Sequence, residues 1–267
     1  MSRQRDTDAR RHILEVAITL FAERGLDAVS VRDIVGAAGV NLGAINYYFG
    51  SKELLIREIF ETLLGPVQTR RLALLDQLEM QAGDGPLDME LVLRALIEPT
   101  VRDVIGQQGP QTYLPRLMFQ AYAVSRPFLD DKLSERNDYT AKRFIDALAR
   151  SAPGIPYEEI CWRYYLVIGG FLQLISDAQH PQRLRQLSGG RCDPDNPDRM
   201  IEVLIAFFLF GMKAPAPSGN ARAAQDRAFA SSAHERQPVD IVDRKVAKER
   251  ARKRSSVKAK KPSYTAP

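Results

Sequence analysis

The stretch AAGVNLGAINYYFGSKELL, residues 37–55, decides how the rest of the chain is interpreted. Its pattern predicts a short helix that contains Gly43 and ends in two adjacent tyrosines. A helix of about two turns has little stability by itself. Glycine within a helix costs up to about 1 kcal/mol relative to alanine. We therefore expect this element to exist because another molecule needs its surface.

The residues before this stretch predict a first helix at about 7–24. Apolar side chains recur there at the three- and four-residue spacing of one helix face. Asp6 and Thr7 offer oxygens that can cap its N-terminus, and Gly25 stands where a left-handed C-cap glycine is expected.

The next residues predict further helix boundaries. Ser30 and Asp33 resemble a capping box at the start of a second short helix, and Gly39 makes a turn. We expect Asn41 to cap the third helix and Ser51 to cap the fourth. Three short helices with a tight turn are typical of a helix-turn-helix, although a small helical subdomain of another kind has similar spacing.

The third helix has chemistry suited to DNA. Ile45 and Phe49 are predicted to point inward. The residues left on outer positions are Leu42, Gly43, Ala44, Asn46, Tyr47 and Tyr48. Asn46 can pair with adenine, and tyrosine hydroxyls can donate to phosphate oxygens. Lys52 joins the backbone N–H groups at the start of the fourth helix in a candidate anion site. Core packing of the tyrosines is the alternative.

The composition favours an all-α protein. Hydrophobic residues make up 45% of the chain and charged residues 27%, which is ordinary for a globular protein. We expect Gly65-Pro66 to break the fourth helix. A loop is predicted at 185–198. The further predicted helices span 66–81, 87–106, 112–124, 127–151, 156–178 and 196–213.

The positive charge is concentrated at the C-terminal end. The chain has a formal net charge of +5, but the residues from 214 to 267 carry +8, so the remainder carries −3. This segment lacks apolar content and is predicted to be a disordered basic tail. It either binds phosphate non-specifically and strengthens DNA affinity, or is a solvated extension without function.

Other features narrow the function classes. The longest apolar runs, 164–175 and 203–212, are shorter than the roughly 20 residues of a membrane span. The charged N-terminus does not resemble a secretory signal. Cys161 and Cys192 suit a reducing compartment, so we expect a cytoplasmic protein. The three histidines form no cluster, and the sequence predicts no catalytic residue, cofactor or metal site.

Residues 10–55 resemble the N-terminal DNA-binding domain of TetR-type transcriptional repressors. The resemblance rests on LFAERG in the first helix, SVRDIVGAAGV in the second, and YYFGSKELL at the start of the fourth. It implies a helix-turn-helix domain at 1–52 and a helical ligand-binding and dimerisation domain at 53–213. The tail, 214–267, lies outside the resemblance.

The resemblance also implies a mechanism. A homodimer binds double-stranded palindromic operator DNA, and a small hydrophobic effector releases it; such a protein is a regulator and not an enzyme. The last two long helices, 156–178 and 196–213, build the dimer interface. The DNA contacts implied by position are Ser30, Arg32, Asn41, Leu42, Gly43, Ala44, Asn46, Tyr47, Tyr48 and Lys52. Family members often have Tyr at the position of Asn46 and His at that of Tyr48, which indicates a different operator.

The second domain resembles one branch of the family in LLGPV, LVLRALIEP, RLMFQAY and YYLVIGG. Members of that branch respond to long-chain fatty acids or acyl thioesters. Six aromatic residues either line an effector cavity or belong to the core: Phe119, Tyr122, Phe128, Trp162, Tyr165 and Phe171. Two other functions stay open, namely an enzyme or carrier for an acyl ligand and a non-specific DNA binder driven by the tail.

Overall fold

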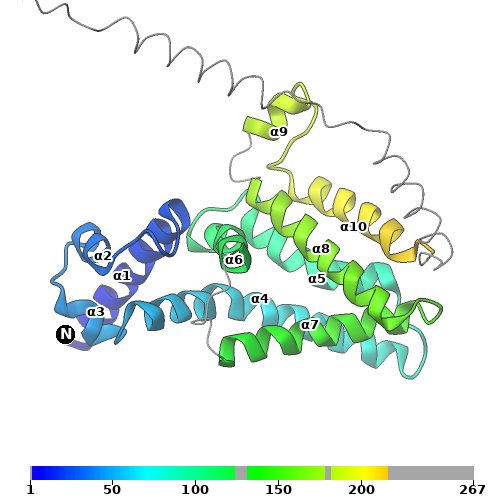
Figure 1. Cartoon of the computed structure of the whole chain (residues 1–267), viewed down its shortest axis with the longest axis horizontal. Coiled ribbons are helices and arrows are strands. Elements are labelled where there is room, and N and C mark those ends of the chain that lie inside the picture. The colour runs from blue at the N-terminus through cyan, green and yellow to red at the C-terminus, as the bar shows by residue number, and fades with distance from the viewer. Residues whose placement is uncertain (1, 124–130, 178–181, 216–267) are drawn as a thin grey trace, which may run out of the picture. The chain divides into compact units, whose positions relative to one another are not determined.

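The structure is a computed structural model that describes residues 2–123, 131–177 and 182–215. Within these ranges the chain forms helices and no β-strand, which confirms the all-α fold class (Figure 1). The predicted tail lies outside the described residues except for its first two. The elements are α1 (Ser2–Arg24), α2 (Val31–Ala38), α3 (Gly43–Tyr48), α4 (Lys52–Ala82), α5 (Met89–Val104), the 3-10 helix η1 (Pro110–Tyr113), α6 (Leu114–Ala123), α7 (Asp131–Ser151), α8 (Tyr157–Asp177), α9 (Gln182–Leu187) and α10 (Pro197–Lys213).

Helices α1, α2 and α3 pack together with the start of α4 at one end of the described chain (Figure 1). Phe21 of α1, Ile34 of α2 and Ile45 of α3 are fully buried in a shared apolar core. Phe49 follows α3 and is also buried, so both predicted inward positions are confirmed. This core fixes how the short helix α3 presents its other face.

Local hydrogen bonds set the ends of these helices. The Asp33 N–H donates to Ser30 Oγ at 3.2 Å, and the Ser30 N–H donates to Asp33 Oδ2 at 2.8 Å, which completes the predicted capping box. Gly39 ends α2 in the left-handed conformation with φ of 66°. Ser51 Oγ accepts from the Leu54 N–H at 3.1 Å at the start of α4, as predicted.

Two predictions about helix starts are wrong. Helix α1 begins at Ser2, because the polar run before residue 7 contains no glycine or proline to stop it, so Asp6 and Thr7 lie inside the helix. Asn41 does not cap α3 with its side chain; Leu42 occupies the N-cap position in helical conformation. The Asn41 carbonyl accepts from the Ala44 N–H at 3.1 Å, so the backbone performs that role.

The predicted break at Gly65-Pro66 is also wrong, because α4 continues through it. Proline removes the hydrogen bond to the carbonyl four residues earlier, that of Thr62. Pro66 and Thr62 are both exposed, so water can bond to that carbonyl. The neighbouring Leu63 and Val67 are buried and hold the helix together on its inner side.

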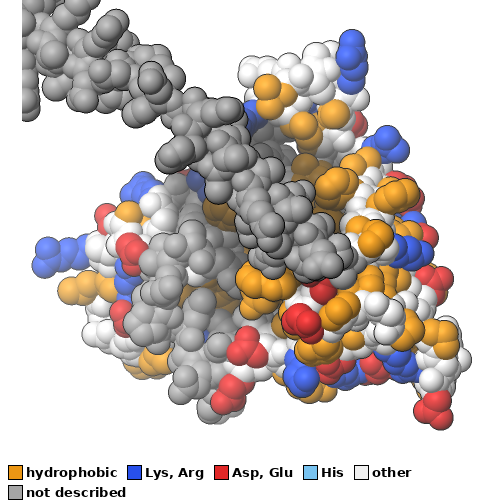
Figure 2. All heavy atoms as spheres, turned by 45° about the vertical axis from the view of Figure 1, so that its right-hand side comes forward, with side chains coloured by type: hydrophobic (Ala, Val, Ile, Leu, Met, Phe, Trp, Pro, Cys, Tyr) orange, Lys and Arg blue, Asp and Glu red, His pale blue; other side chains and the backbone are white. Residues whose placement is uncertain are grey.

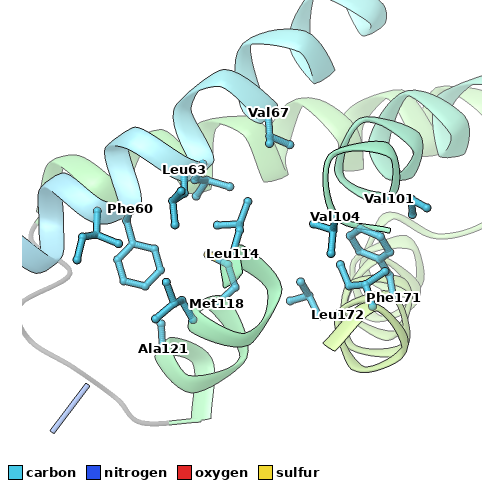
Figure 3. Close-up of a cluster of buried hydrophobic side chains, with 14 of the residues drawn as sticks. Phe60, Leu63, Val67, Val101, Val104, Leu114, Met118, Ala121, Phe171 and Leu172 are labelled. Carbon is cyan, nitrogen blue, oxygen red and sulfur yellow. The ribbon is translucent and has the colours of Figure 1, made fainter. Parts of the chain in front are cut away.

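The rest of α4 joins α5 to α8 and α10 in a helical bundle. Figure 3 shows one buried cluster that brings together Phe60 and Leu63 of α4, Val104 of α5, Met118 of α6 and Leu172 of α8. Helix α6 packs against both α4 and α8. The short α9 overlaps the start of the predicted loop, and η1 precedes α6 where a longer helix was predicted.

None of the helices in the described ranges is long and apolar enough to cross a membrane.

Candidate DNA-binding surface and internal cavity

Helix α3 presents a polar face to solvent. Tyr47 is 75% exposed and Leu42 is 55% exposed, and Gly43 and Asn46 are exposed too. The prediction that Ala44 stands on an outer position is wrong, because its side chain is buried in the apolar core. The exposed face therefore consists of the residues before the helix and one side of its two turns.

Gly43 leaves space on this face. The nearest atom to a Cβ built at this position is Asn41 Oδ1, at 3.3 Å. The Asn41 side chain is exposed and can turn away, so the fold itself tolerates a side chain here. A glycine at this place lets another molecule approach the backbone closely.

The two tyrosines differ in what they contact. Their rings meet edge to face with centroids 4.8 Å apart. The Tyr48 hydroxyl donates to Asp6 Oδ1 of α1 at 3.3 Å, and its ring is half-buried. Partial desolvation, followed by the Asp6 carboxylate, raises the pKa of Tyr48 above its usual value. Tyr47 stands in solvent, so it is the better placed of the two to bind an external partner.

Three predicted contact residues flank α3. The Ser30 hydroxyl donates to Asp33 Oδ2 at 2.5 Å, and this bond is the main cause of the lowered pKa of Asp33. Arg32 in the first turn of α2 is exposed and makes no hydrogen bond or ion pair among the described residues. Lys52 begins α4, and its Nζ lies 5.6 Å from the centroid of the Phe21 ring. Arg32 and Lys52 thus place a cation in each of the helices that precede and follow α3 in the chain.

A cavity of about 520 Å³ lies among α4, α5, α6, α7 and α8. This volume falls in the range of small-molecule sites. Its apolar wall includes Leu64, Leu96, Met118, Ile168 and Leu172. Four of the five buried polar or charged side chains in the described part of the chain also line it: Gln68, Arg71, Thr100 and Thr140.

Three of these four side chains, those of Gln68, Arg71 and Thr100, hydrogen-bond to partners that also line the cavity. Arg71 Nη2 donates to Thr100 Oγ1 at 2.7 Å, and its guanidinium carbon lies 5.9 Å from the centroid of the Phe171 ring. Gln68 Nε2 donates to Asn137 Oδ1 of α7. The cavity therefore combines apolar walls with a small polar patch, which is typical of a ligand site.

The predicted cavity residues are found in part. Phe119, Tyr165 and Phe171 line the cavity, whereas Trp162 is 70% exposed and lies outside its lining. The side chains of Tyr122 and Phe128 lie outside the described residues.

The sequence analysis did not predict the polar patch of the cavity, although the sequence of α4 contains a pattern that indicates it. Leu64, Gln68, Arg71 and Leu75 recur at four-, three- and four-residue steps, so they share one face of α4. Two polar residues on an otherwise apolar stripe mark this position.

Helix α6 joins the cavity to α1. Leu114 and Met118 line the cavity, while Gln120 Nε2 donates to the Ala22 carbonyl at 3.2 Å. Arg116 Nη2 donates to the Glu23 carbonyl at 3.5 Å. Both acceptors lie in the last turn of α1, where carbonyls lack helical donors. Two hydrogen bonds therefore join α6 to the C-terminal end of α1.

An apolar surface lies on α8 and α10. Leu166 is 72% exposed, Phe207 73% and Phe210 85%, and Trp162 adds a large aromatic side chain. Figure 2 shows hydrophobic side chains at the surface on the side of the molecule where α10 lies. A cluster of large exposed apolar side chains marks an interaction surface. Among the described residues, no group of three or more His, Cys, Asp or Glu side chains could hold a metal ion.

Two family models match the chain. The model described as "Bacterial regulatory proteins, tetR family" matches residues 13–59. The model described as "Tetracyclin repressor-like, C-terminal domain" matches residues 94–211. The first match runs from within α1 to the start of α4, and the second runs from within α5 into α10 and includes most of the residues that line the cavity.

Curated relatives match the N-terminal part. The HTH-type transcriptional repressor KstR2 of Rhodococcus jostii is 49% identical over 55 residues, which are 21% of this chain and 27% of the relative. The HTH-type transcriptional regulator AcrR of Shigella flexneri is 42% identical over 60 residues, which are 22% of this chain and 28% of the relative. The chain thus matches little more than a quarter of the length of either relative.

Solved structures share the fold over most of the chain. KstR2 of Mycobacterium tuberculosis, a ketosteroid transcriptional regulator, superposes with a TM-score of 0.54 at 19% identity, covering 76% of this chain and 93% of that one. AibR, solved with isovaleryl coenzyme A and operator DNA, gives a TM-score of 0.55 at 13% identity, covering 74% and 97%. At these identities the likeness concerns the fold alone.

Proposed function

This chain belongs to the TetR family of bacterial regulatory proteins, and we propose that it is a transcriptional repressor released from operator DNA by a small effector. One combination of features supports this proposal most. The same chain carries an exposed polar face on α3 and an internal cavity of about 520 Å³. We propose the domain division 1–52, 53–213 and 214–267 for these roles, and the cytoplasm as the place of action.

The proposed DNA contacts surround α3. Tyr47 and Asn46 face outward from it, and Gly43 gives the DNA room at its first turn. Arg32 and Lys52 supply positive charge for the phosphates on either side. The remaining proposed contacts are Ser30, Asn41, Leu42, Ala44 and Tyr48, of which Ala44 acts only through its backbone because its side chain is buried.

The proposed active species is a homodimer through α8 and α10. Helix-turn-helix dimers bind half-sites about 34–36 Å apart, so a palindromic operator requires two copies. The exposed apolar side chains Leu166, Phe207 and Phe210 would be buried between the copies. Phe207→Glu together with Phe210→Glu should yield a monomer in sedimentation analysis, and the monomer should lose tight operator binding.

The proposed release mechanism runs through α6. An effector in the cavity contacts Leu114 and Met118, and movement of α6 shifts the contacts of Gln120 and Arg116 with the end of α1. The spacing of the two α3 helices in the dimer then departs from that of the operator. By linkage, DNA must lower effector affinity by the same factor as the effector lowers DNA affinity.

The effector is proposed to be small and largely hydrophobic, because apolar side chains form most of the cavity wall. The fold neighbours KstR2 and AibR are, by their descriptions, a ketosteroid regulator and a complex with isovaleryl coenzyme A. Both descriptions agree with a hydrophobic effector such as a fatty acid or acyl thioester in this chain.

The test is a titration of the full chain against a fluorescent DNA fragment from its own upstream region, with random DNA as control. The proposal expects sequence-selective binding with two protomers per site. Repeating the titration at two salt concentrations, and with a chain that ends at residue 213, measures the contribution of the basic tail. Equal binding to both DNAs that is lost without the tail would contradict the proposed role of α3.

A further inference from the structure

The cavity concentrates the buried polarity of the bundle. Gln68, Arg71, Thr100 and Thr140 are at least 91% buried, and all four line the same space. Burying polar groups costs free energy unless they are hydrogen-bonded, and burying a charge costs more. Apolar residues of similar size would fill these positions at lower cost. A ligand that uses the polar groups gives a reason for their presence.

The charges of the lining are unequal in burial. Arg71 on α4 is 9% exposed, while Asp138 on α7 is exposed to solvent. Water and salt screen the exposed carboxylate, whereas the buried guanidinium acts at short range in a medium of lower dielectric constant. Of the two charged side chains that line the cavity, Arg71 is therefore the one whose charge acts more strongly inside it.

The guanidinium is held in a fixed orientation. Thr100 Oγ1 accepts from Nη2 at 2.7 Å, and the Phe171 ring lies beside the group at 5.9 Å. A guanidinium carries five N–H donors in a planar fork, so it can serve Thr100 and a ligand together. Gln68 lies one helical turn earlier on the same face of α4 and adds an amide.

We propose that the effector is an amphipathic monocarboxylate whose head group binds Arg71, with Gln68 and Thr100 beside it. Its apolar body lies against Leu64, Met118 and Leu172. A planar carboxylate matches the guanidinium fork, and its single charge matches the one buried cation of the cavity lining. This inference rests on the proposed function for its regulatory meaning, but the binding itself does not require DNA.

The experiment is isothermal titration calorimetry of the full chain without DNA at neutral pH. The probes are straight-chain carboxylates from butanoate to tetradecanoate, each compared with the alcohol and the alkylammonium of equal length. We expect the best carboxylate to bind at least about tenfold more tightly than its alcohol, because a hydrogen bond between two charged groups is stronger than one to a neutral hydroxyl. Equal or tighter binding of the alcohol or the alkylammonium, or no binding by any carboxylate, overturns the proposal.

Arg71→Met tests the assigned residue, and Arg70→Met is the matched control. Arg70 is the neighbour on α4, but it pairs with Asp103 and lies outside the cavity lining. Arg71→Met should remove the preference for carboxylate over alcohol while the alcohol still binds; Arg70→Met should keep it. If Arg71 were only structural, both variants would keep the preference, and the proposal would fail. Arg71→Lys, which retains the charge without the fork, should keep part of the preference if Arg71→Met folds poorly.

The outcomes separate this inference from the proposed function. Carboxylate binding that depends on Arg71, in a protein that does not select its upstream DNA, would support the inference and contradict the repressor proposal. Selective DNA binding without a preference for carboxylates would support the repressor proposal and contradict this inference. Selective DNA binding that decanoate, or the best carboxylate found, weakens in the wild type and not in Arg71→Met would support both.

Discussion

The DNA-facing surface and the cavity are built in opposite ways. The surface around α3 comes from a continuous segment of the chain, residues 30–52, and its outward side chains are solvated. The cavity draws on five helices from Leu64 to Leu172, and four of its polar side chains are buried. At the surface, caps and turns position the functional groups; in the cavity, tertiary packing positions them.

This difference determines how each region tolerates change. Side chains on the α3 face can be altered at little cost in stability, because few of them pack against the protein. Arg71 and Gln68 support packing and hydrogen bonds as well as any ligand, so substitutions there affect binding and stability together. Variants of the solvent-exposed side chains on that face should therefore change DNA affinity with little effect on stability.

The largest expected effect is that of Gly43→Glu. A carboxylate in the first turn of α3 favours the helix dipole, so the fold should keep its stability. The same carboxylate meets the DNA phosphates, and juxtaposed like charges cost several kcal/mol, so operator affinity should fall at least about a hundredfold. Fluorescence titration and thermal unfolding measure the two effects.

The matched control for Gly43→Glu is Gly154→Glu. Gly154 lies between α7 and α8, is exposed, and has no atom within 4 Å of an added Cβ. The Gly154→Glu substitution changes the net charge by the same amount as Gly43→Glu, and it should leave operator affinity within about twofold of the wild type. A similar loss in both variants would mean that overall charge, and not the α3 face, controls binding.

A smaller effect separates the two tyrosines. Tyr47→Phe removes a solvent-exposed hydroxyl and should weaken operator binding about three- to tenfold, the value of one hydrogen bond. Tyr48→Phe removes a hydroxyl that donates to Asp6, so DNA binding should change less and thermal stability more. Equal losses of DNA affinity would show that Tyr48 leaves Asp6 when DNA binds.

The link between the regions is tested by Gln120→Leu. The leucine keeps the size of the side chain but removes the donor to the Ala22 carbonyl. We expect the factor by which the effector weakens DNA binding to fall about three- to fivefold, with each affinity measured alone nearly unchanged. Operator titrations with and without decanoate, or the best carboxylate found, give this factor. Gln77→Leu, at an exposed position on α4, is the control and should leave it intact.

The sequence predicted the surface around α3 better than the cavity, because local structure positions the first and tertiary packing positions the second. The capping box at Ser30, the turn at Gly39 and the inward positions of Ile45 and Phe49 depend on neighbours within a few residues, and all of these predictions are confirmed. The polar patch of the cavity depends on the packing of α4 against α5 and α7, which no local pattern specifies.

Two of the three wrong helix predictions have related causes. Pro66 was expected to end a helix, but the buried residues beside it outweigh the loss of one hydrogen bond on the exposed side. Asn41 was expected to cap α3, but the backbone before α3 is already helical and its carbonyl accepts the bond. In both cases the environment outweighed an otherwise sound local preference.

The smallest expected effect concerns the capping box that orients α2 beside α3. Asn at position 33 can still accept from the Ser30 N–H, but it lacks the charge that the Ser30 hydroxyl and N–H stabilise. These bonds lower the pKa of Asp33 below its usual 3.8, so its stabilising contribution is present above that pH and is lost as the pH falls through the folded-state pKa. Asp33→Asn should therefore lower Tm slightly at neutral pH, and the difference from the wild type should shrink below about pH 3.8. Thermal unfolding followed by circular dichroism measures it. If the Tm difference between Asp33→Asn and the wild type were the same at neutral pH and below about pH 3.8, the charge of Asp33 would contribute nothing. Local hydrogen bonding alone would then set the start of α2.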